Sequence, residues 1–424
     1  MRTIPYRSNV LTGGAVISFG GVKVGIFGVG YTPDAGEKGG KPSDGRALAY
    51  PALNPTETVV EQSIEKMRAM GAEFIVALTH LPWDEDQALI DKYASKGLGL
   101  LVGGHDHTNM TLCDEQGKTV GVKADSDART AWRIDVRITP GGNPEFEPKL
   151  IALNEIYAPA DLDLKRIADK WYVKAGKRIC AERARRRNEP YDEKCLEKAV
   201  GRAQFAIELE ESANRTKETV FGDWLADTVA TKMGADIAII NAGILGLNED
   251  LEAGSEIRVR HIEDIFRFND IVAVKKISAK TVCNAVAHGF NTPGAGAWPH
   301  VSGLEVELKL SPKGNKATVT RFGKGELDCQ SKDMVSVAAV PYLLCNGDGY
   351  KFLEFAGDKE TCREEIRSMQ KEKHYLSDIA EDAIRVGGDR GVAVEKKANR
   401  IKFIPSDVVT KNGRACSPAV TFAQ

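Results

Sequence analysis

Hydrophobic and polar positions predict a strand, a helix and a second strand between residues 72 and 102. Residues 72–78 form a short apolar run with Phe, Ile and Val, which is typical of a buried strand. Residues 84–95 carry acidic side chains in the first turn and apolar ones at helical spacing, and residues 97–102 form a second apolar run. Such a unit makes its strands parallel neighbours. Both strands therefore end at one edge of the sheet, where open α/β sheets bind ligands.

Three of the seven histidines follow these two strand ends. His80 comes directly after the first strand. His105 and His107 follow the second strand, behind a pair of glycines that permits a sharp turn. Because neutral imidazole is the commonest metal ligand, the pattern predicts a metal site. In an extended segment His105 and His107 would point to the same side, whereas a tight turn would let them reach different metals. The alternative is that these histidines only hydrogen-bond to neighbouring loops.

The remaining pattern predicts an α/β protein with two domains and a charged helical segment between them. Residues 8–30 alternate as strands, residues 31–55 form a long loop, and residues 56–70 form a helix. Strands within residues 118–154 complete the first domain. Residues 160–212 are helical and strongly charged.

The second domain begins near residue 200 and mixes helices with strands. Residues 220–233 form a helix, and residues 235–243 (ADIAIINAG) form a buried strand that ends in a glycine turn. Further apolar runs predict strands at residues 271–278, 303–310, 317–322 and 334–344.

Composition fits a globular protein and excludes some classes of function. The 424 residues are 42% hydrophobic and 28% charged, which is enough material for about two or three domains. A net charge of −2 gives no signature of a nucleic-acid-binding protein. No apolar stretch approaches the roughly 18 residues of a membrane-spanning helix. The first 14 residues lack the apolar core of a signal peptide, so a cytoplasmic location is the default expectation.

A basic run at residues 183–187 (RARRR) favours a solvated linker helix over a nucleic-acid patch, because Glu182 and Glu189 flank it and no aromatics interleave. The eight cysteines contain no CxxC pair and are expected to be buried thiols. In an oxidising compartment, either a Cys180–Cys195 or a Cys329–Cys345 bridge is conceivable.

An ordered set of motifs resembles the 5'-nucleotidase family. The motifs run in the order THLP, GGHDHT, NRTKETVFGDWLAD, NAG, FRFND, GAWPHVSGL, NGDGY and NRIKF, and the resemblance extends from Ser8 to Phe403. The resemblance implies a partial metallophosphatase β-sandwich with flanking helices, a linker helix and a mixed α/β substrate-binding domain. In residue terms, the metallophosphatase part is 1–155, the helical linker 156–200 and the C-terminal domain 201–424.

The resemblance implies hydrolysis of nucleotide phosphoesters with divalent metal ions, zinc or manganese, of which the family uses two. Carried over, His80 and His105 bind one metal and His107 binds the other. Two such metals clamp an attacking water and a phosphate, lowering the pKa of the water. The implied partner is a small-molecule nucleotide or nucleoside rather than a nucleic acid.

Two aromatic residues match the family's pair that sandwiches the base, namely Trp298 and Tyr342. Base–aromatic stacking is worth about 1–3 kcal/mol per base. The alternative for Trp298 is core filling, but its Gly- and Pro-rich loop favours stacking. Tyr342 ends an apolar strand and is equally well explained as buried packing.

Four further residues match family positions that contact the substrate. Asp348 matches a ribose-binding carboxylate, and Arg215 matches an arginine that faces ribose and phosphate. A turn-capping role is the alternative for Asp348, and an ion pair with Glu218 is the alternative for Arg215. Asn241 matches a substrate-contacting Asn, and Gly243 permits close approach.

The sequence also departs from the family pattern. The D-x-H, G-D and G-N-H-[DE] motifs do not precede Thr79, so no catalytic Asn–His pair is assigned and the chain is expected to begin midway through the first domain. Gly246 stands where the family has a substrate-binding Arg, and Arg267 replaces a usual Pro.

Three functional hypotheses follow. The first is a metal-dependent phosphoester hydrolase acting on nucleotides, and the second is a catalytically defective nucleotide-binding protein. The third keeps the hydrolase but changes its substrate to a cyclic nucleotide, a nucleotide sugar or another phosphorylated metabolite, as the departure at Gly246 suggests.

Overall fold

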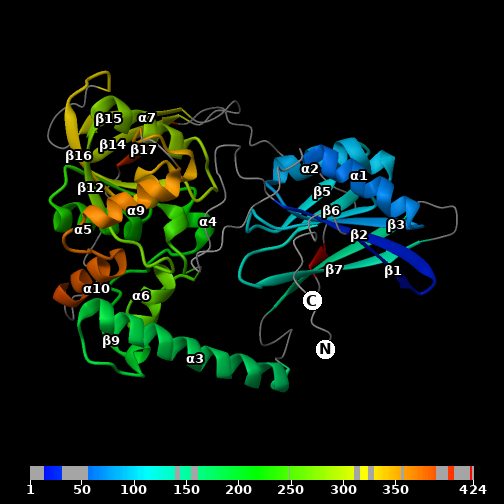
Figure 1. Ribbon diagram of the computed structural model, residues 1–424, viewed down its shortest axis with the longest axis horizontal. Coiled ribbons are helices and arrows are strands. Elements are labelled where there is room, and N and C mark those ends of the chain that lie inside the picture. The colour runs from blue at the N-terminus through cyan, green and yellow to red at the C-terminus, as the bar shows by residue number, and fades with distance from the viewer. Residues whose placement is uncertain are drawn as a thin grey trace. The chain divides into compact units, whose positions relative to one another are not determined.

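The computed structural model forms two compact units, which are described separately (Figure 1). One comprises Met1–Asp161 with Lys411–Gln424, and the other comprises Leu162–Thr410. The structure describes residues 14–30, 56–138, 144–153, 161–247, 249–309, 316–322, 329–354, 358–387, 400–404 and 421–422. The strand expected at residues 8–10 and the loop expected at residues 31–55 lie outside these ranges.

The first unit contains a six-stranded sheet with the order β1-β2-β3-β4-β6-β5. Its strands are β1 Ala15–Phe19, β2 Val22–Gly30, β3 Phe74–His80, β4 Leu100–Gly103, β5 Met110–Cys113 and β6 Thr119–Lys123. β3 and β4 are parallel neighbours, with Thr79 opposite Gly103, which confirms the predicted strand–helix–strand unit. β6 continues the parallel set, with Gly103 opposite Lys123. His80 and Lys123 therefore lie at the same edge of the sheet.

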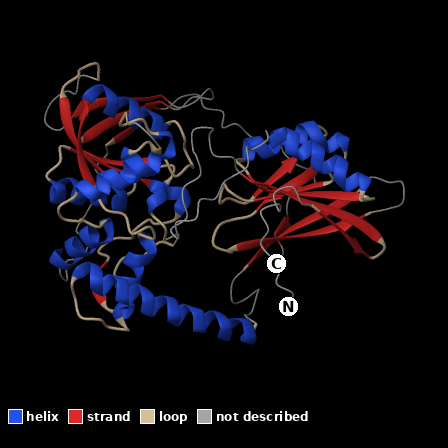
Figure 2. Cartoon of the chain, in the orientation of Figure 1, coloured by secondary structure: helices blue, strands red, loops and turns tan. Residues whose placement is uncertain are grey.

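Helices and a second sheet cover the two faces of this sheet. Helices α1 Thr56–Ala69 and α2 Trp83–Tyr93 lie over one face, where apolar side chains from both join the core (Figure 1). Strands β7 Thr130–Arg137, β8 Glu145–Ala152 and β18 Thr421–Phe422 form a smaller sheet on the other side (Figure 2). Phe146 of β8 contacts Phe74 of β3, with ring centroids 5.9 Å apart. This arrangement is the β-sandwich with flanking helices that was predicted.

The second unit is built on a four-stranded sheet with the order β12-β16-β10-β13. β10 pairs in parallel with β16, with Ala238 opposite Ala338, and in antiparallel with β13. The strands of this unit are β9 Ala199–Arg202, β10 Ile237–Asn241, β11 Glu256–Arg258, β12 Ala273–Ser278, β13 Pro299–Ser302, β14 Leu304–Lys309, β15 Lys316–Phe322, β16 Met334–Ala339 and β17 Ile401–Ile404. Its helices are α3 Leu162–Arg187, α4 Glu211–Asn214, α5 Val220–Met233, α6 Val259–Ile265, α7 Ala279–Phe290, α8 Pro341–Leu344, α9 Lys359–Met369 and α10 Leu376–Gly387.

The apolar run at residues 334–344 is shorter as a strand than its pattern predicts. β16 ends at Ala339, and Pro341 begins the short helix α8. The prediction that Tyr342 ends a strand was wrong, because proline is pre-organised for the first helical position and ends the extended segment before Tyr342. Tyr342 is instead carried by α8.

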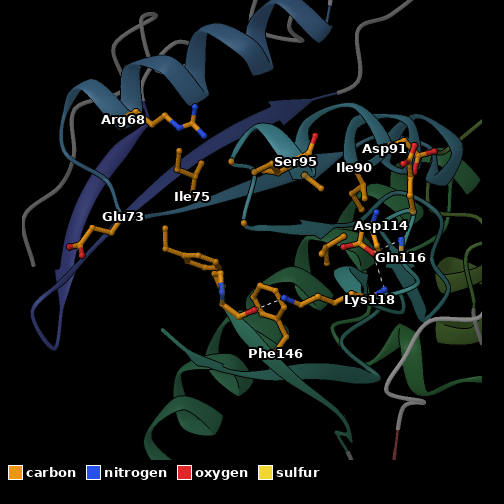
Figure 3. Close-up of a pocket in the computed structure, with 18 residues that line it drawn as sticks. Arg68, Glu73, Ile75, Ile90, Asp91, Ser95, Asp114, Gln116, Lys118 and Phe146 are labelled. Atoms are coloured by element: carbon orange, nitrogen blue, oxygen red, sulfur yellow. Dashed lines mark hydrogen bonds between the residues drawn. The ribbon is translucent and has the colours of Figure 1, made fainter. Parts of the chain in front are cut away.

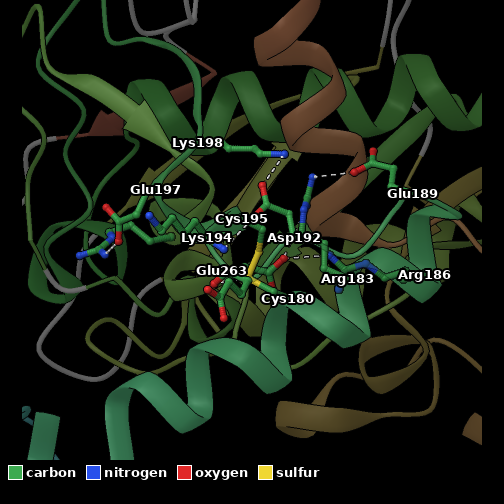
Figure 4. The surroundings of a disulfide bond; sticks show 12 residues. Cys180, Arg183, Arg186, Glu189, Asp192, Lys194, Cys195, Glu197, Lys198 and Glu263 are labelled. Atoms are coloured by element: carbon green, nitrogen blue, oxygen red, sulfur yellow. Dashed lines mark hydrogen bonds and ion pairs between the residues drawn. A yellow bond between two sulfur atoms is a disulfide. The ribbon is translucent and has the colours of Figure 1, made fainter. Parts of the chain in front are cut away.

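The basic run at residues 183–187 is not a solvated face. The side chain of Arg183 is only 5% exposed and donates two hydrogen bonds, of 2.5 and 2.6 Å, to the Glu381 carboxylate of α10. Arg186 pairs with Glu263 and Asp378, and Figure 4 shows both arginines close to Glu263. The prediction was wrong because paired carboxylates on α6 and α10 remove these guanidinium groups from water.

Disulfides replace the expected buried thiols, and no cysteine within the described part is free. Cys180 bonds to Cys195, as one of the two alternatives predicted (Figure 4). The other pairs are Cys283–Cys329 and Cys345–Cys362, so the alternative pairing of Cys329 with Cys345 was wrong. Sequence spacing does not reveal which cysteines the fold brings within bonding distance.

None of the helices in the described ranges is both long enough and apolar enough to cross a membrane.

Candidate functional site

A pair of histidines converges at the carboxyl edge of the parallel strands in the first unit. His80 is the last residue of β3, and His105 lies in the loop that follows β4. Their rings meet edge to face, with centroids 5.2 Å apart and planes at 86°. The prediction that these two histidines come together is confirmed. We refer to this pair and the loop at residues 104–107 as the histidine corner.

The backbone of the histidine corner is strained. His105 has φ 80° and His107 has φ 56°, both in the left-handed region that residues other than glycine seldom adopt. Such conformations cost about 1–3 kcal/mol each and persist only where the surrounding structure enforces them. Burial lowers the pKa of His105, while Asp106 opposes this shift. The ring is therefore favoured in its neutral form, which is the form that binds metals.

A buried lysine lies beneath the histidine corner. Lys123 ends β6 and is 0% exposed. Its Nζ donates hydrogen bonds of 2.6 Å to the Leu81 carbonyl and 2.6 Å to Asp86 Oδ2, and it lies 2.5 Å from Asp106 Oδ2. Burial raises the pKa of Asp86, and Lys123 opposes that rise. Sequence analysis missed Lys123, although its position after an apolar parallel strand was a signal that it would reach this edge.

The histidine corner fits a divalent metal as two of its ligands. Neutral imidazoles suit zinc, but a structural or catalytic zinc site has three or four protein ligands. Across the ranges that the structure describes, no three or more His, Cys, Asp or Glu side chains form a group that could hold a metal ion. The three histidines therefore do not form one metal-binding group among the described residues. That His80 and His105 bind one metal and His107 a second stays a prediction.

The predicted substrate residues of the second unit come together around Asp348. Its Oδ1 accepts a 2.6 Å hydrogen bond from the Tyr342 hydroxyl, and its Oδ2 accepts a 2.9 Å bond from Asn241 Nδ2. Asn241 ends β10, and Tyr342 and Asp348 follow the end of its parallel neighbour β16. These residues thus lie at the carboxyl edge of a parallel strand pair. Asp348 also has a left-handed backbone, with φ 52°.

Arg215 and the glycine loops lie against this cluster. The backbone of Gly243 contacts that of Gly296, where a Cβ on Gly243 would lie 3.1 Å from the Gly296 Cα. Gly294 donates a 2.8 Å hydrogen bond to the Arg215 carbonyl. Burial lowers the pKa of Arg215, and the charges of Glu211 and Asp348 oppose this. We refer to Arg215, Asn241, Gly243, Tyr342 and Asp348 as the Asp348 cluster.

Two buried polar atoms of the Asp348 cluster lack partners. Nε of Arg215 and Oδ1 of Asn241 have no hydrogen-bond partner among the residues that the structure describes. Such groups are rare enough in protein interiors to need an explanation. The ion pair of Arg215 is with Glu211. The proposed alternative with Glu218 was wrong, because Glu218 accepts a 2.7 Å hydrogen bond from the Arg400 backbone.

Trp298 is a core residue in this structure. Its side chain is 1% exposed and packs edge to face on Phe290, with ring centroids 4.9 Å apart. The prediction that it stacks on a base was wrong for this conformation, since neither ring face is accessible. Trp298 directly precedes β13, which pairs with the buried strand β10, so the loop turns the ring inward despite its glycines.

Tyr342 is partly buried, and an arginine lies over its ring. The guanidinium of Arg363, from α9, is 4.7 Å from the ring centroid, which is within cation–π range. Burial raises the pKa of Tyr342, so its hydroxyl stays a donor to Asp348. Sequence analysis missed Arg363, because α9 is an amphipathic helix in which no pattern marks one arginine from another.

The part of the chain that carries this cluster is similar to a known protein family. Residues 199–354 match the family described as 5'-nucleotidase, C-terminal domain. The matched residues lie within the second unit. The Asp348 cluster lies within the matched residues.

One curated protein and several solved structures are similar to this chain over most of its length. The chain is 25% identical over 355 residues to the trifunctional nucleotide phosphoesterase protein YfkN of Bacillus subtilis (strain 168), covering 80% of this chain and 22% of that protein. The chain therefore spans about a fifth of the length of this curated relative. Its structure resembles that of a 5'-nucleotidase precursor from Thermus thermophilus, with TM-score 0.67 and 19% identity, covering 93% and 75% of the two chains.

A sulfate thiohydrolase, SoxB, from Thermus thermophilus is also similar in structure. Its TM-score is 0.64 at 16% identity, with 93% of this chain and 65% of that chain covered. At these identities the likeness shows a shared fold alone. The fold class of the 5'-nucleotidases is thus confirmed for this chain.

The two departures from the 5'-nucleotidase pattern in the C-terminal domain are linked in space. A Cβ on Gly246 would lie 2.7 Å from both Cδ and Nε of Arg267. The arginine side chain therefore occupies the space that a side chain at position 246 would need. Gly246 and Arg267 are sterically complementary, so we interpret them as one coupled exchange.

A cavity in the first unit lies away from the histidine corner. It has a volume of about 640 Å³ and is lined by residues near the amino ends of β3 and β4, including Ile75 and residues 97–99 (Figure 3). Arg68 and Lys118 also line it. Ligands of open α/β sheets bind at the opposite, carboxyl edge. We assign it no role in the chemistry of the histidine corner.

Proposed function

We propose that this protein binds nucleotides and hydrolyses their phosphoester bonds, with a divalent metal ion, zinc or manganese, at the histidine corner. The observation that carries the proposal is the Asp348 cluster. A carboxylate, an amide, a phenol and a guanidinium converge at one carboxyl edge of a 5'-nucleotidase C-terminal domain, from segments far apart in the sequence.

The Asp348 cluster has the donors and acceptors that a nucleoside requires. The Asp348 carboxylate is suited to accept hydrogen bonds from the two hydroxyls of a ribose, in exchange for Tyr342 and Asn241. Asn241 Oδ1 is an acceptor that still lacks a donor, and Arg215 Nε is a donor that still lacks an acceptor. Arg215 is the cation of the cluster, and its planar fork suits a phosphate.

At the histidine corner, His80 and His105 would hold the metal as two of its ligands. A bound divalent metal there supplies an acidified water and neutralises charge that develops on the phosphate. The neutral state of His105, which its burial favours, is what such a role requires.

The second candidate is nucleotide binding without hydrolysis. The observation in its favour is that His80 and His105 form only a pair, since no larger ligand group is found in the described ranges. The coupled exchange at Gly246 and Arg267 supports the third hypothesis, a hydrolase whose substrate is another phosphorylated metabolite.

Calorimetric titration with adenosine and adenosine 5'-monophosphate tests the binding proposal. We expect Asp348→Asn to weaken nucleoside binding at least about tenfold, since hydrogen bonds to charged groups contribute about 1.5–3 kcal/mol. Glu372→Gln is the matched control, because it makes the same change of charge on a side chain that is 81% exposed. If the parent and Asp348→Asn bind adenosine with equal affinity, the Asp348 cluster is not the nucleoside-binding site.

Phosphate release from the same nucleotide, with added manganese or zinc, separates the two candidates. Release that depends on the metal supports hydrolysis, whereas binding without release supports the second candidate. A chain that neither binds the nucleotide nor releases phosphate contradicts both.

A further inference from the structure

Lys123 connects three segments at the histidine corner. Its Nζ contacts the Leu81 carbonyl, which follows His80, and the Asp86 carboxylate in the first turn of α2. Its third partner is Asp106, which stands between His105 and His107. The ammonium group thus donates two hydrogen bonds and forms an ion pair with Asp106, and each partner comes from a different segment.

Asp106 uses both carboxylate oxygens to fix the loop. Oδ2 meets Lys123, and Oδ1 accepts a 3.1 Å hydrogen bond from the backbone N–H of Trp83, the first residue of α2. The N-cap residue of α2 is Pro82, which offers no side-chain cap. Asp106 therefore accepts a hydrogen bond from a backbone N–H that has no partner within α2. Its negative charge is also favoured at the N-terminus of a helix.

The Lys123–Asp106 contact thereby joins the loop after β4 to the loop after β3. His80 directly precedes one of these loops and His105 lies in the other, and their rings are in edge-to-face contact. The left-handed backbone at His105 and His107 needs such an external constraint, since isolated residues of this type avoid it. Lys123 together with the carboxylates of Asp86 and Asp106 carries a net charge of −1. This charge favours a bound cation at the neighbouring histidine corner.

We propose that Lys123 and Asp106 are positioning residues that hold His80 against His105, and that Asp106 binds the lysine and α2 rather than a metal. The proposal rests on the role of the histidine corner in the proposed function. In this proposal Asp106, the middle residue of the H-D-H motif, supports the imidazole rings of His80 and His105.

The test compares Asp106→Ala with the parent chain. This variant leaves Lys123 paired with Asp86 and with the Leu81 carbonyl, so no buried charge loses its only partner. Lys123→Met is the second variant. Lys118→Met is the matched control, because Lys118 precedes the same strand, β6, at its other end and its Nζ likewise donates to a backbone carbonyl, that of Pro144.

The first measurement is the nuclear Overhauser effect between the His80 and His105 rings in metal-free, histidine-labelled protein. We expect the effect in the parent and in Lys118→Met, and its loss in Asp106→Ala and in Lys123→Met. A persistent effect in Asp106→Ala would overturn the proposal, and so would an equal loss in Lys118→Met.

The second measurement is zinc affinity by calorimetry, with at least a tenfold loss expected in Asp106→Ala. If zinc binding disappears while the ring contact remains, Asp106 is itself a ligand and the positioning role is refuted. If the parent binds neither zinc nor manganese but the ring contact follows the Lys123–Asp106 pair, the metal-dependent function fails and the positioning role stands.

Discussion

Single residues with unusual backbone conformation mark both candidate sites. Among the described residues, eight that are not glycine have positive φ, and four of them are His105, His107, Asn346 and Asp348. Strain of this kind persists where tertiary contacts enforce it, and it gathers at functional sites. In the first unit the Lys123 contacts provide the constraint, and in the second the hydrogen bonds of Asp348 do so. The strain therefore supports the choice of these two sites independently of their motifs.

Trp298 provides a residue-scale test of core filling against base stacking. We expect Trp298→Ala to lower the free energy of unfolding by about 3–5 kcal/mol, because it leaves a large cavity beside Phe290. Trp171→Ala is the control, since that side chain is 59% exposed and a surface substitution changes stability by about 0.5 kcal/mol or less. Denaturant unfolding measures both, and a cost for Trp298→Ala no larger than the control contradicts the core assignment.

Asp270 gives the second unit a pH-dependent stability. Burial raises the pKa of Asp270 to about 6, with Arg367 and Arg363 opposing, from an ordinary value of 3.8. Between these values the folded state holds a proton that the unfolded state has lost, so stability falls as pH rises from about 4 to about 6. Asp270→Asn should remove this fall and gain up to about 3 kcal/mol at pH 7. The free energy of unfolding of the parent and of Asp270→Asn, measured across this pH range, tests the prediction. If both proteins show the same pH dependence, Asp270 is not its cause.

At the scale of elements, both candidate sites follow one rule. In each unit the candidate side chains stand at or just beyond the carboxyl ends of parallel strands, β3 and β4 in the first and β10 and β16 in the second. Hydrophobic periodicity is sufficient to predict such strands, and the parallel crossover then fixes which ends meet. For this reason the sequence predicted that His80 and His105 would converge.

Periodicity does not show which helix faces are covered by another element. The arginines at the end of α3 have the pattern of a solvated face, yet α10 and α6 supply carboxylates that enclose them. An isolated helix pattern contains no information about a partner nearly 200 residues away in sequence. The same reason explains why Lys123 and Arg363 were missed.

The Arg183–Glu381 pair should anchor α3 on α10. We expect Glu381→Gln to destabilise the second unit by about 3–5 kcal/mol, because it leaves Arg183 buried without its full counter-charge. Asp169→Asn is the control on the same helix, where the exposed pair of Lys165 and Asp169 should contribute about 0.3–0.5 kcal/mol. Chemical unfolding measures both, and similar losses would show that the buried pair contributes no more than an exposed one.

For the whole molecule, the two units have separate hydrophobic cores. The second unit contains both partners of the Cys180–Cys195, Cys283–Cys329 and Cys345–Cys362 disulfides. Disulfides persist in oxidising compartments and are rare in the cytosol. We therefore expect these three pairs to form only where the protein meets an oxidising environment.

Reduction should destabilise the second unit strongly. Each disulfide typically contributes about 2–4 kcal/mol by restricting the unfolded chain, so a reductant should lower the unfolding midpoint by several degrees. Unfolding with and without reductant measures the effect, and peptide mapping of the alkylated, non-reduced protein identifies the pairs. A recovered Cys329–Cys345 peptide would contradict the structure.

The resemblance to the 5'-nucleotidase family predicted which residues gather around Asp348. The hydrophobic pattern of the sequence predicted the order of strands and helices and the two histidine-bearing strand ends. It could do so because strand periodicity and chain crossover are local or nearly local properties. Tertiary structure decided that Trp298 faces the core, that Lys123 supports the histidine corner, that Arg267 fills the space above Gly246 and which cysteines pair. Each of these depends on contacts between segments distant in sequence, and burial and charge pairing act only after the fold has brought them together.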